Sequence, residues 1–339
     1  MECLLHRIRL LFLCLALVFL CGCASQKHIL FGIYAVPLKN LPAAREIGFD
    51  FVVGPSEEKY LAAAKDSNLK VIGSGPKFFS DSTLIGNYLT DEPDLYDIPP
   101  DRIATEFRAA KRRSSKPVFL NLSSAYSFES YGAYSDIPMF DWYPIGWQPI
   151  ETYYSNLRIA RLAAGKKPFF CVVQVFDWSL YPKLMPPSKL YRPPTGPEVK
   201  AMTLWAAMSG AAGIAFYPFD DGTSRLNDSP DLVAAIQESI RLVRENEPYF
   251  NGPRVWAPYP FHFQNESDKT NAVTETSITV KFSRDPGGPQ KLLVVAANTT
   301  PRNIVVTIEP SFQIADVGPS LEFVPFEVKL LRASLSPPK

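Results

Sequence analysis

The chain has 339 residues, 46% of them apolar, and its 35 Lys and Arg nearly balance its 34 Asp and Glu to give a formal net charge of +1. A near-neutral chain with scattered cations lacks the basic footprint of a nucleic-acid-binding protein, so we expect no nucleic-acid partner. The aromatic content of 13% argues against disorder despite 32 prolines, and the length suffices for one barrel-sized domain and a smaller second domain.

The N-terminal segment has the pattern of a targeting signal. Basic residues up to Arg9 precede an apolar run from Leu10 to Leu20, which is too short to span a bilayer as a stable helix. The run leads into the sequence Leu-Cys-Gly-Cys-Ala-Ser at residues 20–25, which resembles the lipobox of bacterial lipoproteins. The resemblance implies a signal peptide over residues 1–22 and lipidation of Cys23.

A lipid at Cys23 would tether the protein to a membrane surface through a linker at residues 23–27. Ala24, directly after the cysteine, implies by the same resemblance sorting to the outer membrane of a Gram-negative organism. We therefore expect a protein of the bacterial cell envelope, lipid-anchored outside the cytoplasm. An ordinary secretory signal is the alternative.

Eight short apolar runs follow, and helical patterns separate several of them. The runs expected to form strands are residues 29–36, 49–54, 70–73, 83–89, 117–122, 139–144, 168–176 and 213–217. The expected helices are residues 56–68, 100–113, 151–164, 198–212 and 230–246. Because strands and helices alternate, the sheet should be parallel, and eight strands favour a closed (β/α)8 TIM barrel over residues 28–250.

Beyond residue 250 the pattern changes to strands alone. Four segments alternate or run apolar, namely residues 276–283, 291–298, 303–308 and 323–331. They predict a small antiparallel β-sandwich over residues 251–333, followed by a tail at residues 334–339.

Acids stand where several predicted barrel strands end, which is where the chemistry of a TIM barrel takes place. They are Asp91 and Glu92 after strand four, Asp141 at the end of strand six, Asp177 after strand seven and Asp220 after strand eight. Cleavage of a glycosidic bond needs two carboxyl groups, one to give a proton and one to activate water or attack the sugar. Glu92 is the first candidate for a catalytic carboxylate.

Polar and aromatic side chains at the same strand ends are candidates for binding a sugar. The expected substrate-binding residues are Asp91, Tyr143, Gln174, Asp177, Trp178, Tyr217 and Asp220. The proline-rich segment 179–196 is expected to form a wall of the cleft, with Tyr181, Tyr191 and Arg192 facing the ligand. No group of His, Cys, Asp and Glu has metal-ligand spacing, so we expect neither a catalytic metal nor a cofactor.

Residues 28–250 are similar to the superfamily of (β/α)8 glycoside hydrolases that includes cellulases, β-galactosidases and agarases. The similarity rests on the sequence Asp-Glu-Pro at residues 91–93, on Asp-Trp-Tyr-Pro at residues 141–144, and on the helix that leads into residues 210–214. The strand-four motif of that superfamily reads Asn-Glu-Pro, and its glutamate is the acid/base. The resemblance implies that role for Glu92, with Asp91 in the place of the asparagine.

The end of strand seven departs from that pattern. The superfamily's nucleophile is a glutamate there, but this chain has Gln174, and an amide cannot act as the nucleophile. Asp141 is the first candidate for the second carboxylate because it shares a face of its strand with Tyr143, and Asp177 and Asp220 remain candidates.

We therefore predict a glycoside hydrolase-like enzyme that cleaves a poly- or oligosaccharide by carboxylate acid/base catalysis. One alternative is a non-catalytic glycan-binding lipoprotein built on a degenerate barrel, which the missing strand-seven glutamate favours. Another is a structural lipoprotein of the envelope.

Overall fold

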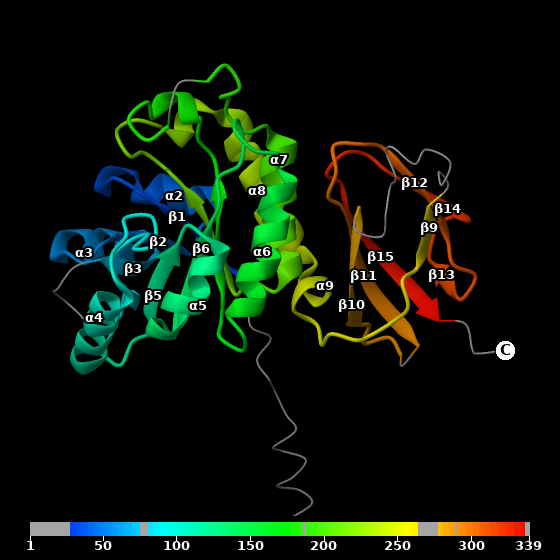
Figure 1. Ribbon diagram of the computed structural model, residues 1–339, viewed down its shortest axis with the longest axis horizontal. Coiled ribbons are helices and arrows are strands. Elements are labelled where there is room, and N and C mark those ends of the chain that lie inside the picture. Colours follow the sequence, from blue (N-terminus) through cyan, green and yellow to red (C-terminus); the bar gives the residue numbers. More distant parts are fainter. Residues whose placement is uncertain (1–27, 75–80, 186–187, 264–276, 289, 336–339) are drawn as a thin grey trace, which may run out of the picture.

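The structure is a computed structural model that describes residues 28–74, 81–185, 188–263, 277–288 and 290–335 (Figure 1). The expected signal peptide, the lipidation site Cys23, the linker and residues 336–339 of the expected tail lie outside these ranges. Within the described ranges, no helix is both long and apolar enough to cross a membrane.

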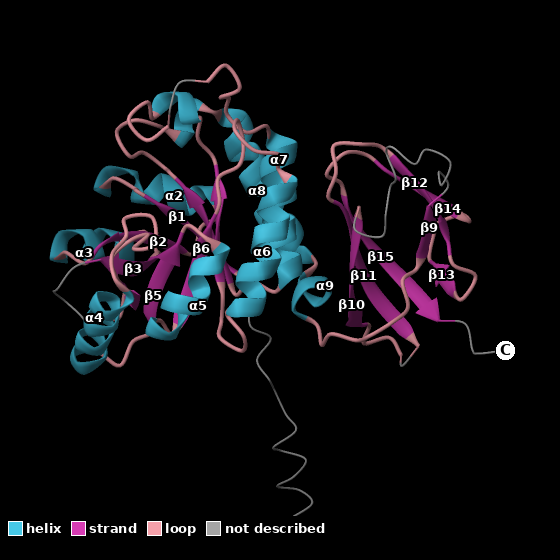
Figure 2. Cartoon of the chain, viewed as in Figure 1, coloured by secondary structure: helices cyan, strands magenta, loops and turns pink. Residues whose placement is uncertain are grey.

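Eight parallel strands close into a barrel that helices surround, which confirms the predicted TIM barrel (Figure 2). The strands are β1 (Leu30–Tyr34), β2 (Phe51–Pro55), β3 (Lys70–Ser74), β4 (Leu84–Tyr88), β5 (Val118–Leu122), β6 (Ile137–Asp141), β7 (Phe170–Gln174) and β8 (Gly213–Tyr217). Each strand pairs with the next along the chain, and β8 pairs with β1 to close the ring.

The helices follow the predicted pattern with two additions between barrel strands and a third, short one after the last predicted helix. They are α2 (Leu41–Ile47), α3 (Glu58–Asp66), α4 (Pro100–Arg113), α5 (Phe128–Tyr131), α6 (Glu151–Ala163), α7 (Gly196–Ser209), α8 (Pro230–Glu245) and α9 (Glu247–Asn251). Short 3₁₀ helices lie at Leu38–Asn40, Ala125–Ser127, Gly132–Tyr134, Trp178–Leu180 and Leu226–Asp228. The sequence did not predict α2 and α5 because segments of two turns or fewer show little helical periodicity.

Aromatic side chains fill the barrel interior near the start of the strands. The rings of Phe51 and Phe170, the first residues of β2 and β7, lie 5.7 Å apart, and Phe119 of β5 lies 5.3 Å from Phe170. Gly213 is needed beside them, because a Cβ there would lie 2.2 Å from the Phe170 ring. This apolar filling leaves the carboxyl ends of the strands as the place for polar side chains.

Two antiparallel sheets form the second domain, which confirms the predicted β-sandwich. One sheet has the order β10 (Ile278–Arg284), β11 (Lys291–Asn298), β15 (Val328–Leu335) and β13 (Phe312–Ile314), and the other has the order β14 (Ser320–Phe323), β12 (Ile304–Ile308) and β9 (Phe261–Phe263).

The last predicted strand of this domain, residues 323–331, differs from the structure. It is divided between β14 and β15, which belong to different sheets. The turn between them places Phe326 at a φ of 60° and its ring 6.2 Å from that of Trp205 in α7, so the turn packs on the barrel. Strand β15 continues to Leu335, beyond the predicted end of the domain at residue 333.

Candidate active site

Glu92 lies in the turn that follows β4, at the carboxyl end of the barrel. Its φ of 41° falls in the left-handed region that residues other than glycine seldom adopt, and such backbone conformations cluster at functional sites. The carbonyl of Glu92 accepts hydrogen bonds from the amides of Leu95 at 3.0 Å and Tyr96 at 3.3 Å. The turn therefore fixes the direction in which the strand end presents this carboxyl group.

The carboxyl group of Asp141, the last residue of β6, donates a hydrogen bond to the carboxyl group of Glu92. Burial raises the pKa of Asp141 well above its usual value, and the neighbouring charge of Glu92 raises it further. Burial also raises the pKa of Glu92 to about 7, although the hydrogen bond from Asp141 opposes this shift. Asp141 is thus the protonated member of the pair, and Glu92 exchanges its proton near neutral pH.

A polar network connects this pair to two other strands of the barrel, β5 and β1. Nδ2 of Asn121 in β5 donates to Oδ2 of Asp141 at 2.9 Å and to Oδ1 of Asp91 at 3.2 Å. The hydroxyl of Tyr88 in β4 donates to the same oxygen of Asp91 at 2.5 Å, and the hydroxyl of Tyr34 in β1 lies 3.1 Å from that of Tyr88. The network therefore crosses the barrel mouth from β1 to β6.

The carboxyl group of Asp91 is enclosed by these donors, although part of the residue is exposed. Burial of this group raises its pKa, while the hydrogen bonds from Tyr88 and Asn121 oppose the shift. One buried acceptor nearby, Oδ1 of Asn121, receives no hydrogen bond from an amide or hydroxyl of the described residues. A buried acceptor without such a donor is rare in a purely structural network, so it supports a functional site here.

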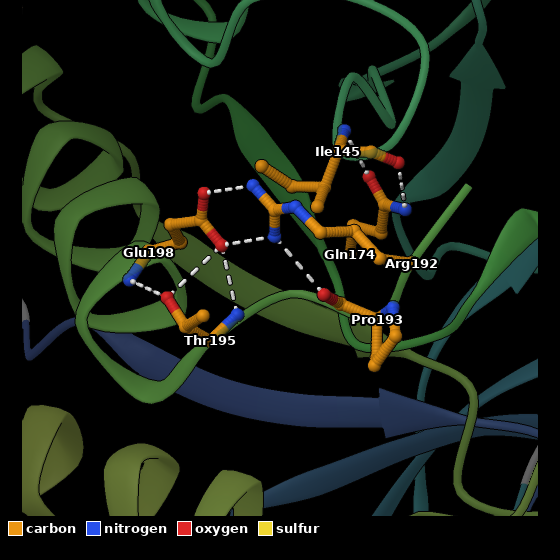
Figure 3. Close-up of polar contacts among 6 residues, drawn as sticks. All are labelled: Ile145, Gln174, Arg192, Pro193, Thr195 and Glu198. Carbon is orange, nitrogen blue, oxygen red and sulfur yellow. Dashed lines mark hydrogen bonds and ion pairs between the residues drawn. The ribbon is translucent and has the colours of Figure 1, made fainter. Parts of the chain in front are cut away.

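Gln174, the last residue of β7, holds two loops together. Its Oε1 accepts a hydrogen bond from the amide of Ile145 at 2.8 Å, and its Nε2 donates to the carbonyl of Ile145 at 3.1 Å (Figure 3). Nε2 also donates to the carbonyl of Phe176 at 3.1 Å. The side chain is completely buried. These contacts give the predicted substrate contact of Gln174 no support, because its amide is used to join the loops after β6 and β7.

Two further contacts fix the proline-rich loop after β7. Gly146, at a φ of 96°, lies so close to this loop that a Cβ there would be 3.1 Å from the backbone nitrogen of Arg192. The guanidinium of Arg192 donates two hydrogen bonds, of 2.7 and 2.8 Å, to the carboxylate of Glu198 in α7 (Figure 3). Arg192, which we expected to face a ligand, therefore holds the loop to α7.

The same carboxylate completes the start of α7. Glu198 accepts hydrogen bonds from the amide and the hydroxyl of Thr195, which caps the helix. Burial alone would raise the pKa of Glu198, but the hydrogen bonds from Arg192 and Thr195 outweigh it and keep the pKa below its usual value. Glu198 is therefore an ionised structural carboxylate.

Aromatic side chains from β8 and from the loops after β6 and β7 form one wall of the mouth. Tyr143 lies beyond the end of β6, so it does not share a face of that strand with Asp141 as predicted. The rings of Tyr143 and Tyr217 stack at 5.9 Å, and Nε1 of Trp178 donates to the carbonyl of Tyr143 at 2.9 Å. Burial raises the pKa of the Tyr143 phenol, and the charges of Asp141 and Glu92 raise it further. The structure therefore brings the predicted residues Tyr143 and Tyr217 to the carboxyl pair, with Trp178 behind Tyr143.

The acids after β7 and β8 are engaged within their own loops. Asp177 accepts a hydrogen bond from the amide of Ser179 at 2.7 Å, and Asp220 accepts one from the amide of Gly222 at 3.0 Å. Asp220 also forms an ion pair of 3.6 Å with Arg225. Acids with such contacts commonly stabilise turns, and this role accounts for the positions of both side chains. The contacts therefore make Asp177 and Asp220 weaker candidates than Asp141 for the partner of Glu92.

Three residues of the network were not predicted from the sequence, namely Tyr34, Tyr88 and Asn121. Asn121 carried a usable signal, because it is the one polar residue in the otherwise apolar run 118–122, and a polar side chain inside a buried parallel strand needs a partner. The tyrosines are common strand residues, so nothing in the sequence distinguished them.

The contact between Glu92 and Asp141 decides what the pair can do. Carboxyls in hydrogen-bond contact lie closer than the two carboxyls of a retaining glycosidase, at about 5–5.5 Å, or of an inverting one, at about 6.5–9.5 Å. The contact therefore favours a pair that shares a proton over two carboxyls on opposite sides of a sugar. Within the described part of the chain, no group of three or more metal-ligating side chains is present.

No known protein-family profile matches the sequence, and no curated protein matches it. Solved structures of similar shape do exist. The α-amylase from Geobacillus thermoleovorans, complexed with acarbose, has a TM-score of 0.52 at 10% identity, over 92% of this chain and 99% of the amylase chain.

Two other enzymes show the same likeness. The β-galactosidase from the Antarctic haloarchaeon Halorubrum lacusprofundi has a TM-score of 0.53 at 10% identity, over 68% of this chain and 60% of its own. The α-amylase from H. orenii has a TM-score of 0.50 at 7% identity, over 91% of this chain and 99% of its own. The chain therefore has a (β/α)8 glycoside hydrolase-like fold, as the sequence resemblance implied. At this identity, the likeness extends to the fold alone.

Proposed function

We propose that the protein hydrolyses glycosidic bonds of a poly- or oligosaccharide, with Glu92 as the general acid. The observation that carries the proposal is the position and protonation of this carboxyl group. It lies at the end of β4, and burial raises its pKa to about 7, close to the pH at which proton transfer to a leaving oxygen is most effective. A raised carboxyl pKa in a barrel mouth is characteristic of a catalytic acid.

Asp141 is a positioning residue in this proposal. Its hydrogen bond orients the Glu92 carboxyl, and Asn121 in turn orients Asp141. Because Gln174 replaces the expected nucleophile and is bonded to the main chain, the proposal assigns attack on the anomeric carbon to water. Glu92 gives its proton to the leaving oxygen, the attacking water loses a proton to the solvent, and Glu92 is reprotonated from the solvent. The stacked rings of Tyr143 and Tyr217 supply an apolar surface for a sugar ring.

The test is hydrolysis of a broad panel of glycans by the wild-type protein and by Glu92→Gln, with release of reducing sugar as the measurement. Loss of general acid catalysis should reduce turnover by about 10²–10⁴-fold. Glu129→Gln, at an exposed position of α5, is the matched control and should retain full activity. Undiminished turnover by Glu92→Gln would remove Glu92 from the mechanism.

A second candidate function is glycan binding without hydrolysis, which the structural role of Gln174 favours. In that case the wild-type protein binds a glycan from the panel and releases no sugar from any of them. Isothermal titration calorimetry on the same panel distinguishes the two functions.

A further inference from the structure

A groove separates the barrel from the second domain on the side of α6 and α7. Its volume is about 650 Å³. The α6 side contributes Arg158, Arg161 and Leu162, and the other side contributes Arg254, Trp256 and Lys281. This groove is separate from the barrel mouth, because none of its lining residues belongs to the network around Glu92.

The groove carries positive charge that the described residues do not neutralise. Its lining includes three arginines and a lysine but no Asp or Glu. Nη2 of Arg254 donates to the carbonyl of Ser209 at 2.9 Å, and Arg161 donates to the carbonyls of Lys167 and Gly165. Burial, with Arg254 adding to the effect, lowers the pKa of Lys281 to about 7. Carbonyl groups thus hold Arg161 and Arg254 in place, while the charge of these arginines stays available to an anion. Lys281, which is buried, adds little to this charge.

Large apolar side chains are exposed beside these cations. Trp256 is 88% exposed and Leu162 is 77% exposed. Exposure of such large apolar side chains to water is unfavourable. Trp is enriched at the boundary between the headgroups and the acyl chains of a membrane, so this position suits both side chains.

The groove lies at the end of the barrel where the described chain begins. Nδ1 of His28 lies 2.6 Å from Oε2 of Glu247 in α9, and the amide of Leu30 donates to the carbonyl of Ala212, just after α7. Arg254 contacts Ser209, the last residue of α7. In Figure 1, α9 and the lower end of α6 lie together at this side, away from the loops that follow the barrel strands.

The predicted lipidation site lies close to this end in sequence. Cys23 precedes His28 by only five positions, and five residues of extended chain span at most about 18 Å. A lipid at Cys23 would therefore hold this end of the barrel near the membrane surface, with the mouth directed away from it.

From this arrangement we infer that the groove between α6, α7 and β10 docks on anionic phospholipid headgroups of the membrane to which the chain is tethered. The arginines pair with headgroup phosphates, and Trp256 and Leu162 enter the interface. A lipid at Cys23 would tether the chain without fixing its orientation, so a second, electrostatic contact orients the barrel on the membrane. The inference uses the predicted anchor and does not depend on the proposed hydrolysis.

The test uses the chain from Ala24 to Lys339, which lacks the predicted signal peptide and the lipidated cysteine, and measures co-sedimentation with phosphatidylglycerol vesicles and with phosphatidylcholine vesicles. We expect binding to the anionic vesicles only, weakening as salt is added. Combining Arg158→Glu with Trp256→Ala should weaken it about tenfold or more. Both positions are exposed and neither side chain has a hydrogen bond or ion pair among the described residues, so folding should be preserved, which circular dichroism checks.

Arg102→Gln is the matched control, because Arg102 is an exposed arginine in the first turn of α4, at the mouth end of the barrel. It should leave vesicle binding unchanged. Equal binding by the double variant and its parent, or no binding to anionic vesicles at all, overturns the inference. So does binding of polygalacturonate that requires Arg158 and Trp256 while vesicles are not bound, since the groove would then be a site for an acidic glycan.

Discussion

Asp141 donates a hydrogen bond to Glu92 between the ends of β6 and β4. Because of this contact, the protonation of each carboxyl group depends on that of the other. Two buried carboxyls in contact cannot both be ionised without strong repulsion, so the pair keeps a proton on Asp141 while Glu92 titrates near neutral pH. The arrangement supplies a proton donor at the mouth without any cationic partner among the described residues around it.

The pKa of Glu92 should respond differently to two substitutions of Asp141. Asp141→Ala removes the hydrogen bond that opposes the upward shift, so the pKa of Glu92 should rise above about 7. Asp141→Asn keeps a donor at the same place and should leave the pKa near its wild-type value. A ¹³C NMR titration of the Glu92 carboxyl measures both, and a fall of the pKa in Asp141→Ala would contradict the proposed direction of donation.

Stability should also depend on pH through Glu92. Its pKa rises from the ordinary value of 4.5 to about 7 in the folded protein, so the folded state binds the proton more tightly than the unfolded state. This contribution is complete below about pH 4.5 and is lost as pH rises through about 7. In Glu92→Gln the free energy of unfolding, measured by urea titration at pH 5 and pH 8, should vary less than in the wild type. If the free energy of unfolding changes between pH 5 and pH 8 as much in Glu92→Gln as in the wild type, the pKa of Glu92 is not raised.

Most of the fold could be predicted from the sequence, because buried parallel strands appear as unbroken apolar runs and the longer helices have amphipathic patterns or clear caps. The position of Glu92 at a strand end was predictable for the same reason. The contact of Glu92 with Asp141 was not, since it depends on how far around the closed barrel β4 and β6 lie and on the turn that sets φ at Glu92. Nor does the sequence reveal that Gln174 bonds to Ile145, because a polar residue at a strand end fits a ligand contact and a loop contact equally well.

Gln174→Glu should destabilise the protein instead of restoring a nucleophile. The new carboxylate would keep one donor, the amide of Ile145, and would face the carbonyls of Ile145 and Phe176, which now accept from Nε2. A buried charge beside two acceptors without donors should cost about 3–5 kcal/mol of unfolding free energy at pH 7. Gln148→Glu, at an exposed position of the loop after β6, should cost less than about 0.5 kcal/mol. Wild-type stability with a gain of hydrolysis in Gln174→Glu would show that this position faces the mouth.

Gly146→Ala should loosen the contact between the loops after β6 and β7. Both the positive φ of 96° and the approach of the Arg192 backbone to 3.1 Å oppose a methyl group there, so we expect a loss of about 1–3 kcal/mol. Gly165→Ala is the control, because Gly165 also has a positive φ, of 61°, but has nothing within 4 Å of a Cβ. Thermal unfolding should show a clearly larger loss for Gly146→Ala. Equal losses would mean that the backbone conformation alone matters and the loop contact does not.

Lys281→Met should stabilise the protein in a pH-dependent way. Lys281 is buried in β10 and donates a hydrogen bond to the carbonyl of Phe250, and burial lowers its pKa from 10.5 to about 7. The unfolded state therefore binds more protons between about pH 7 and 10.5, so wild-type stability should rise with pH across this window and be lowest, through this group, below pH 7. Replacement by methionine removes that slope, of about 5 kcal/mol in all, while the loss of the donor to Phe250 costs about 1 kcal/mol at every pH. Urea titrations at pH 6 and pH 10 should thus show Lys281→Met to be more stable than the wild type at pH 6 and slightly less stable at pH 10.

Lys291→Met, at an exposed position of β11, is the control and should change the free energy of unfolding at neither pH. If the stability of Lys281→Met still rises with pH as steeply as that of the wild type, another group titrates in this range.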